Sequence, residues 1–401
     1  MFLNLTLKRI LGLTVFLGII LSSSSGQITT GELTGEINVI QSAVPFLTIA
    51  PDSRAGAMGD VGAATAPDIN SQHWNAAKYV FMEGQGGAAL SYTPWLRRLI
   101  NDINLAYLAF YKKIDNLQSV SGSLRYFSLG NIIFTDVFGN PQGEMNPNEF
   151  AIDAGYSRLF TDNFSGGIVF RFIRSDLTGR QNVGDIDTKA GIAFAADLSF
   201  YYTDEIDLGT NDGRLSFGTN ISNMGNKISY TETQEPSFIP INWRLGGNLD
   251  VELDEYNSFS FALDLNKLLV PTPPVLDSAG NIAYGKDPNV SVPLGMLRSF
   301  YDAPGYPNTD NPSVFREELN EITYSLGVEY WYRKQFAIRA GYFHENVNKG
   351  NRKYFSVGVG LRLNIFELDF AYLIPTYQNN PLANTLRFTL GFDFDRYRNA
   401  N

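Results

Sequence analysis

Residues 322–333 read ITYSLGVEYWYR, and large apolar side chains recur at every second position of this stretch. One set of alternate positions is Ile322, Tyr324, Leu326, Val328, Tyr330 and Tyr332. The other set, mostly small, polar or charged, is Thr323, Ser325, Gly327, Glu329, Trp331 and Arg333. Because successive side chains of a strand point to opposite faces, the stretch predicts a β-strand with one apolar and one largely polar face.

The same alternation continues through residues 355–362, 367–374 and 386–395. A soluble β-sandwich also alternates in this way, but the positions of the charges distinguish it from a transmembrane barrel. Full charges lie on the polar face, well inside the predicted strands: Glu329, Arg339, Arg362, Asp369 and Arg387. In a transmembrane barrel they point into the lumen, whereas an arginine on the lipid face near the midplane would cost about 2–4 kcal/mol. Aromatic residues near strand ends, such as Tyr330, Tyr332 and Tyr342, fit an interfacial girdle.

The spacing of strands along the chain supports a membrane barrel. We expect about fourteen strands of about ten residues, the length that a tilted transmembrane strand needs. Their predicted centres are Leu90, Tyr107, Ser123, Ala154, Val169, Phe194, Phe217, Leu245, Phe261, Leu326, Ala340, Val359, Phe370 and Leu390. An even number of strands returns the chain to the side where it starts, so both termini are expected in the periplasm.

The connections alternate in length along the chain. The longer ones follow odd-numbered strands: 95–102, 128–148, 175–188, 223–238, 270–320 and 375–383. The connection at 346–351 is modest, and 203–212 is intermediate. The tight ones follow even-numbered strands: 113–116, 161–163, 253–256, 333–335 and 363–365. Long outer loops and short periplasmic turns are typical of outer-membrane barrels, so we predict an all-β transmembrane antiparallel barrel over residues 83–397.

The N-terminal residues indicate export. Lys8 and Arg9 precede an apolar run from Ile10 to Leu21, and small residues follow up to Gly26. This order predicts a cleaved signal peptide over residues 1–26 and a mature chain that begins near Gln27. The run is too short for a typical spanning helix.

Composition narrows the possible functions. The chain has no cysteine, which excludes disulfides and thiolate metal sites. Its formal net charge of −10 argues against nucleic acid as a partner, because phosphate binding needs clustered Lys and Arg. We therefore expect membrane lipid, and no nucleic acid, around this chain.

Residues 27–82 do not follow the strand pattern. The stretch is dense in Ala and Gly, and irregular backbone at membrane depth is tolerated only where protein or water covers it. We expect it to form a plug inside the lumen, with a short helix near Ser71 to Lys78. Four of its charges are candidates to pair with the lumenal charges of the strands: Arg54, Asp60, Asp68 and Lys78.

Part of this stretch also resembles a known family. APDSRAGAMGDVGAATAPD at residues 50–68, followed by HWNAAK at 73–78, resembles the N-terminal signature of the PorV family, outer-membrane barrels of the type IX secretion system. The resemblance implies a fold similar to the long-chain fatty-acid transporter barrels and a function without catalysis. It also implies binding of the C-terminal signal domains of secreted cargo. The family carries cargo from a large outer-membrane translocon barrel to an attachment complex with a sortase partner. It supplies no ligand map at residue level.

The residues offer little material for catalysis. The only histidines are His73, expected to be packed in the plug, and His344, expected at a strand end. The acidic turn that contains Asp204 and Asp212 lacks the glutamate that closes an EF-hand loop, so it is interpreted as a solvated turn. We therefore predict no enzyme activity, no metal site and no cofactor.

The connection at 270–320 is far longer than the others, and such loops are usually functional or disordered. It carries an apolar set that either folds over the barrel mouth or docks a partner: Val290, Val292, Leu294, Met296, Leu297, Phe300 and Tyr301. We take Val292 to Tyr301 as the candidate partner site of a secretion adaptor. The alternative function is passive transport of hydrophobic small molecules, which needs an apolar route past the plug. Inward-facing Trp331 and Phe343 leave room for a small apolar pocket in the lumen.

Overall fold

The computed structural model describes residues 37–394, except 98–99, 101, 136–137, 139, 180–186, 210, 234, 308, 310–311, 378–381 and 383–384. The expected signal peptide at 1–26, the expected mature start at Gln27 and residues 27–36 of the expected plug lie outside this part. None of the described helices is both long and apolar enough to cross a membrane.

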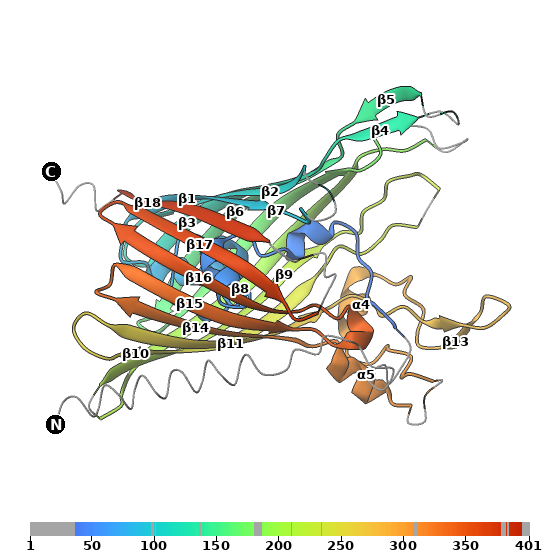
Figure 1. Cartoon of the computed structure of the whole chain (residues 1–401). Coiled ribbons are helices and arrows are strands. Elements are labelled where there is room, and N and C mark those ends of the chain that lie inside the picture. The colour runs from blue at the N-terminus through green and yellow to red at the C-terminus, as the bar shows by residue number, and fades with distance from the viewer. Residues whose placement is uncertain are drawn as a thin grey trace.

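Fourteen of the described strands form one closed barrel in which every neighbouring pair is antiparallel (Figure 1). They are β1 (Gly86–Pro94), β2 (Ile103–Lys113), β3 (Gln118–Leu129), β6 (Asn148–Thr161), β7 (Phe164–Asp176), β8 (Gly191–Asp207), β9 (Asp212–Gly225), β10 (Asn242–Glu252), β11 (Ser258–Leu268), β14 (Thr323–Tyr332), β15 (Phe336–His344), β16 (Lys353–Leu363), β17 (Phe366–Pro375) and β18 (Leu386–Asp393). The sequence-based prediction of a fourteen-stranded barrel is confirmed, and each predicted centre falls inside one of these strands. β1 pairs with β18, so the sheet has no free edge.

The remaining elements lie in the lumen or at the end of the barrel with the long loops (Figure 1). They are η1 (Pro45–Thr48), α2 (Ser53–Ala57), α3 (Ser71–Trp74), η2 (Ala76–Phe81), β4 (Ile132–Thr135), β5 (Pro141–Met145), β12 (Val275–Leu276), β13 (Ile282–Tyr284), α4 (Val292–Arg298), α5 (Val314–Asn320) and η3 (Val347–Lys349). β4 with β5, and β12 with β13, form two hairpins outside the barrel. A helix near Ser71 to Lys78 was expected; the structure has two short ones, separated at Asn75, whose side chain accepts a hydrogen bond from the Ala77 amide.

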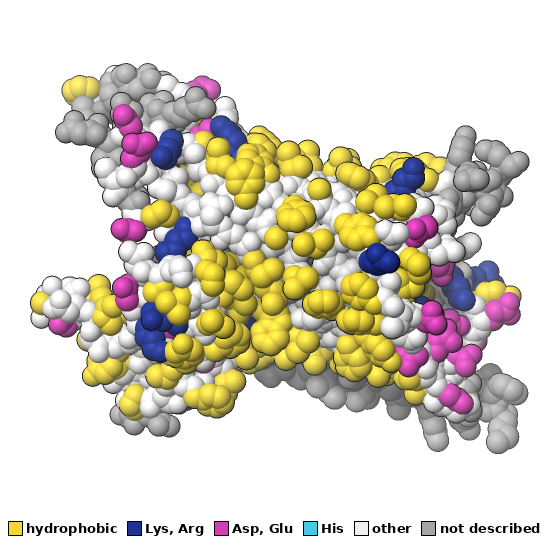
Figure 2. All heavy atoms as spheres, turned by 180° about the vertical axis from the view of Figure 1, so that it is seen from behind, with side chains coloured by type: hydrophobic (Ala, Val, Ile, Leu, Met, Phe, Trp, Pro, Cys, Tyr) yellow, Lys and Arg dark blue, Asp and Glu magenta, His cyan; other side chains and the backbone are white. Residues whose placement is uncertain are grey.

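The strand alternation sorts side chains between lipid and lumen. On β14, Leu326 is 39% exposed on the outer wall, whereas its neighbour Ser325 is fully buried. Figure 2 shows hydrophobic side chains over the middle of the barrel and most of the charged ones near its two ends. This distribution matches an outer-membrane wall, an apolar band with polar ends.

The described chain begins and ends at opposite ends of the barrel. The Asn38 amide donates to the Asn348 carbonyl, and the Ala43 amide donates to the Phe238 carbonyl, both in connections at the end opposite the short turns. β1 then starts at the short-turn end, and β18 finishes there at Asp393. Residues 44–82 therefore run through the lumen, from the long-loop end to the short-turn end. The two termini themselves lie outside the described residues, so their expected periplasmic location stays a prediction.

We call residues 44–82 the lumenal segment. Its backbone lies close to the inner wall because the strands have glycines at the points of contact. A β-carbon added to Gly218 on β9 would overlap the Ala63 carbonyl, and one added to Gly341 on β15 would overlap the Gly59 amide. The small residues on the inward face thus make room for a second layer of backbone.

This close approach predicts the effect of adding one methyl group to the wall. Gly218→Ala should lower the free energy of unfolding by about 1–3 kcal/mol, because overpacking forces the Ala63 carbonyl away from the wall. The neighbouring Gly247→Ala is the control, since its β-carbon would meet Phe217 at an ordinary 3.7 Å. Urea titration of the barrel refolded in lipid vesicles measures both; equal losses would contradict the prediction.

Candidate functional site

Charged side chains join the lumenal segment to the barrel wall. Arg54 of α2 donates to both carboxylate oxygens of Glu329 on β14, at 2.8 and 3.1 Å, and to Asp68 at 2.8 Å. Glu329 also accepts from Arg339 of β15 at 2.6 Å, and Arg339 reaches Asp369 of β17 at 2.5 Å. The five groups form one network across the lumen, in which each buried charge has an opposite partner.

The span from Arg339 to Asp369 crosses β16, which lies between their strands. Gly360 makes this crossing possible, because a β-carbon there would lie 2.7 Å from both Arg339 Nη1 and Asp369 Oδ1. A glycine facing the lumen is therefore part of the ionic network, although it carries no charge.

The other predicted plug and lumen residues have different partners. Asp60 accepts from Arg387 of β18 at 2.8 Å and from the Tyr354 hydroxyl at 2.5 Å. Lys78 donates within the lumenal segment, to the Gly62 carbonyl and the Thr65 hydroxyl. Arg362 pairs with Glu367 at 3.2 Å and lies over the Trp331 ring, and it has no hydrogen bond or ion pair with the segment among the described residues.

Several residues of this interface escaped the sequence analysis. Asp52 caps α2 by accepting from the Ala55 amide, and it binds the Trp74 indole at 2.6 Å. Asp264 of β11 accepts from the Gly62 and Ala63 amides. The alternation marks Asp264 as an inward charge, so the residues could have pointed to it; nothing local marked Asp52.

The two histidines have no catalytic surroundings. His73 lies 2.6 Å from the Arg125 guanidinium and edge-on to Trp74. His344 stacks on Tyr324 and contacts the Tyr342 hydroxyl. Among the described residues, no group of three or more acidic, histidine or cysteine side chains fits a metal ion. In the described part, the partners of both imidazoles are thus arginine, tryptophan and tyrosine side chains.

The long connection folds into what we call the outer helix pair, residues 292–320 with α4 and α5, beside the barrel mouth (Figure 1). Carboxylates of α5, and that of Glu321 directly after it, hold the pair to the rim. Lys267 at the end of β11 donates to Glu318 at 2.9 Å and to Glu321 at 2.7 Å. Lys349 donates to Glu317 at 2.6 Å and to Glu321 at 3.0 Å. The pair is thus fixed at two separate points of the rim.

Acidic groups outnumber the lysines in this cluster. Burial, and then the nearby Glu318 and Glu321 carboxylates, raise the pKa of Asp302 to about 7. Burial and then Glu321 also raise the pKa of Glu318. For Lys349, burial opposes the charge, but Glu321 and Glu317 hold the pKa above its ordinary value. The cluster therefore retains protons that the unfolded loop would release.

The six predicted partner residues divide between two faces of the outer helix pair. Val292 and Met296 pack against the apolar cluster at the barrel mouth. The others are exposed: Leu294, Leu297, Phe300 and Tyr301. Leu297 is the most exposed of them, at 66%. α5 adds Val314, Phe315 and Leu319, which the sequence analysis missed because their spacing shows only once α5 is recognised as a helix. We call the seven exposed residues the outer apolar surface.

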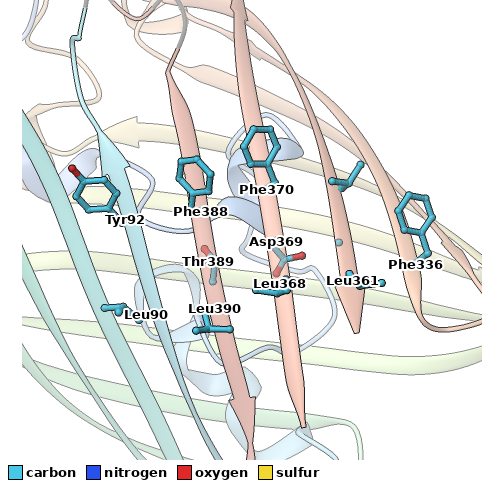
Figure 3. Close-up of a pocket in the computed structure, with 12 residues that line it drawn as sticks. Leu90, Tyr92, Phe336, Leu361, Leu368, Asp369, Phe370, Phe388, Thr389 and Leu390 are labelled. Atoms are coloured by element: carbon cyan, nitrogen blue, oxygen red, sulfur yellow. The ribbon is translucent and has the colours of Figure 1, made fainter. Parts of the chain in front are cut away.

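A shallow depression of about 510 Å³ lies on the membrane-facing wall, across β1 and β15–β18 (Figure 3). Outward apolar side chains line it, among them Leu90, Phe370 and Phe388. Asp369 and Thr389 touch it from the wall but are themselves buried. No convergent polar groups face it, so it has the character of the lipid-facing wall.

These features define a class: an outer-membrane β-barrel whose lumen is occupied by its own N-terminal segment and whose long loops form a compact outer structure. The family model of the type IX secretion system protein PorV matches residues 32–275, more than half of the chain. The chain belongs to the PorV family, and its place is the outer membrane. A search of curated protein sequences returns no match.

Solved outer-membrane barrels are similar to this chain at low identity. The toluene transporter TbuX of Ralstonia pickettii has 11% identity and a TM-score of 0.42, over 86% of this chain and 97% of its own. TodX of Pseudomonas putida, also a toluene transporter, has 10% identity and a TM-score of 0.44, over 89% and 98%. A FadL homologue of Pseudomonas aeruginosa has 10% identity and a TM-score of 0.43, over 89% and 99%.

The ionic network predicts a large loss when its central carboxylate is removed. Glu329→Gln should lower the free energy of unfolding by about 3–5 kcal/mol, because it leaves Arg54 and Arg339 short of a buried counter-charge. Glu367→Gln, which breaks the half-exposed pair with Arg362, should cost less than about 1 kcal/mol. The same urea titration tests this pair of variants, and similar losses for both would refute the assignment.

The raised pKa of Asp302 predicts a pH dependence of the outer helix pair. The folded carboxyl holds its proton to about pH 7, whereas the unfolded one releases it near pH 4. Its contribution to stability is therefore complete below pH 4 and lost as the pH rises through 7. The protection factors of residues 292–320, which are hydrogen-exchange rates corrected for the intrinsic rise of exchange with pH, should fall across this range, and less so in Asp302→Asn. An unchanged pH profile in that variant would count against the assignment.

Proposed function

We propose that this chain is a non-enzymatic adaptor of the type IX protein secretion system. It binds the C-terminal signal domains of secreted cargo and carries them from the large translocon barrel to the attachment complex, where the sortase partner removes the signal. Membership of the PorV family supports the secretion role. The cargo, the translocon barrel and the attachment complex are the protein partners of the proposal, and membrane lipid surrounds the wall.

The outer apolar surface is the observation that carries the adaptor role. Leu297 is 66% exposed on α4, which packs on the mouth through Val292 and Met296. Phe315 is 72% exposed on α5, which ion pairs fix to the rim. Exposed apolar patches of this kind mark sites of protein association. A rigid patch loses little conformational entropy on binding, which favours affinity. The surface lies at the long-loop end, which we assign to the outside of the cell, with the C-terminal end of the barrel in the periplasm.

The alternative, passive transport of hydrophobic small molecules, has one observation in its favour. Apolar inward residues of the outer half of the barrel, such as Leu105 and Phe127, form a cluster inside the mouth. Phe46 and Leu47 of the lumenal segment fill this cluster and are themselves almost fully buried. A transporter would have to displace them, so we favour the adaptor.

The adaptor proposal predicts that a charge on the outer apolar surface weakens partner recovery. Leu297→Glu should reduce co-purification of the translocon barrel and of cargo about tenfold, since it puts a carboxylate into an apolar contact. Leu253→Glu, an exposed leucine at the opposite end of the barrel, is the matched control. The measurement is affinity purification in mild detergent with quantitative mass spectrometry.

Three outcomes are informative. Loss of both partners in Leu297→Glu alone supports the adaptor. Undiminished recovery of both would sink the assignment of this surface. A barrel that purifies alone in all variants, with a small apolar molecule bound, would favour the transporter.

A further inference from the structure

The first described residues lie at the outer mouth of the barrel, before the chain turns into the lumen. Ile37 is 68% exposed and Val39 is 39% exposed. The Asn38 amide bonds to the Asn348 carbonyl at 2.9 Å, and the Ala43 amide bonds to the Phe238 carbonyl at 2.8 Å. These two hydrogen bonds fasten the segment to two different connections at the outer mouth. We call residues 37–43 the N-terminal strap.

The Asn38 side chain ties the strap to the outer helix pair. Its amide nitrogen donates to Glu317 Oε1 at 3.0 Å and to the Pro273 carbonyl at 3.1 Å. One residue thus contacts α5, the start of the long connection and the loop after β15. Asn38 adds a contact where Lys349 already joins α5 to the loop after β15.

Glu317 is the centre of these contacts. Its fully buried carboxylate accepts from Asn38, from Lys349 at 2.6 Å, and from the Gly305 and Tyr306 amides at 2.6 and 3.2 Å. Four donors on one carboxylate, with a single formal positive charge among them, make a strong and specific anchor. Neutralising Glu317 would weaken the hold on the strap and on Lys349 together.

Residues that directly follow the strap are buried inside the barrel mouth, and this determines the direction in which the chain continues. Val44 has a left-handed backbone, φ 48° and ψ 50°, which a β-branched residue adopts only under constraint. Phe46 and Leu47 then enter the apolar cluster inside the mouth, and Arg125 of β3 donates to both of their carbonyls. The chain therefore turns inward at Val44 and descends to β1.

We infer that the N-terminal strap is displayed on the outer surface of the cell and that Glu317 anchors it there, so that the chain enters its own barrel from outside. The inference rests on the orientation given under the proposed function, with long loops outside. It departs from the expectation of a periplasmic N-terminal end.

Single-cysteine labelling tests the location directly, because the chain has no cysteine of its own. Ile37→Cys, in full-length protein in intact cells, should react with a membrane-impermeant maleimide. Ala279→Cys in the β12–β13 hairpin is the control for the outer side, and Asn116→Cys in the β2–β3 turn for the periplasmic side. Asn116→Cys should react only after the outer membrane is permeabilised.

Each pattern decides the matter. Reaction at 37 and 279 in intact cells, without reaction at 116, supports the inference. Reaction at 279 but not at 37 overturns it while leaving the orientation intact. Reaction at 116 but not at 279 overturns the orientation, and with it both this inference and the placement of the outer apolar surface.

A second comparison tests the anchor. Ile40 is half-buried against the apolar cluster, so Ile40→Cys should react slowly in the purified protein. Adding Glu317→Gln or Asn38→Ala should raise the rate about tenfold, the effect of losing a hydrogen bond to a charged group. Glu318→Gln is the matched control, because Glu318 bonds to Lys267 and the Ala303 amide but not to the strap. Equal rates in Glu317→Gln and Glu318→Gln would overturn the role of Glu317.

Discussion

A membrane leaves no backbone amide or carbonyl without a partner, and this constraint organises the whole molecule. Strands satisfy it only when the sheet closes, which the β1–β18 pairing achieves. Closure then assigns every side chain to lipid or to lumen. Only the apolar set of alternate side chains can face the lipid, so the charged side chains of the strands must face the lumen. The interior of this barrel is consequently polar before anything fills it.

The lumenal segment supplies partners for the polar and charged groups of this interior. Inward charges such as Glu329 and Asp369 would be costly if buried without partners, and Arg54 and Arg339 supply the opposite charge. The segment must bring backbone within contact of the wall to do so, and Gly218 and Gly341 permit it. The charged side chains of the segment and the glycines of the wall therefore act together: the first pair with the inward charges, and the second let the segment come close enough to do so. Neither feature alone would hold the segment in place.

The features of the fold that depend on the two-residue period of the strands and on composition could be predicted from the sequence. The strand centres, and the inward direction of Glu329 and Arg339, follow from alternation alone. Which inward charge meets which plug charge does not, because the register between a strand and an irregular segment has no local signal. Arg362 illustrates this: its parity is lumenal, but its place near the strand end pairs it with Glu367 instead. The path of the lumenal segment likewise depends on contacts such as Asn38 with Asn348, which are far apart in sequence.

The outer helix pair shows how the same chemistry serves a different purpose outside the membrane. Here the carboxylates of α5 bind Lys267 and Lys349 from two sides of the rim, so an insertion of about fifty residues is held as a fixed body rather than a loose loop. Because the ionic contacts occupy the inner face of α5, its apolar side chains are left facing outward, Phe315 most of all. In a helix that covers a hydrophobic core, by contrast, the apolar face points inward and the charged face points to solvent. A helix that is held to the barrel by its charged face presents its apolar face to the outside, where another protein can bind it. This arrangement is the physical basis for placing the partner surface on α5.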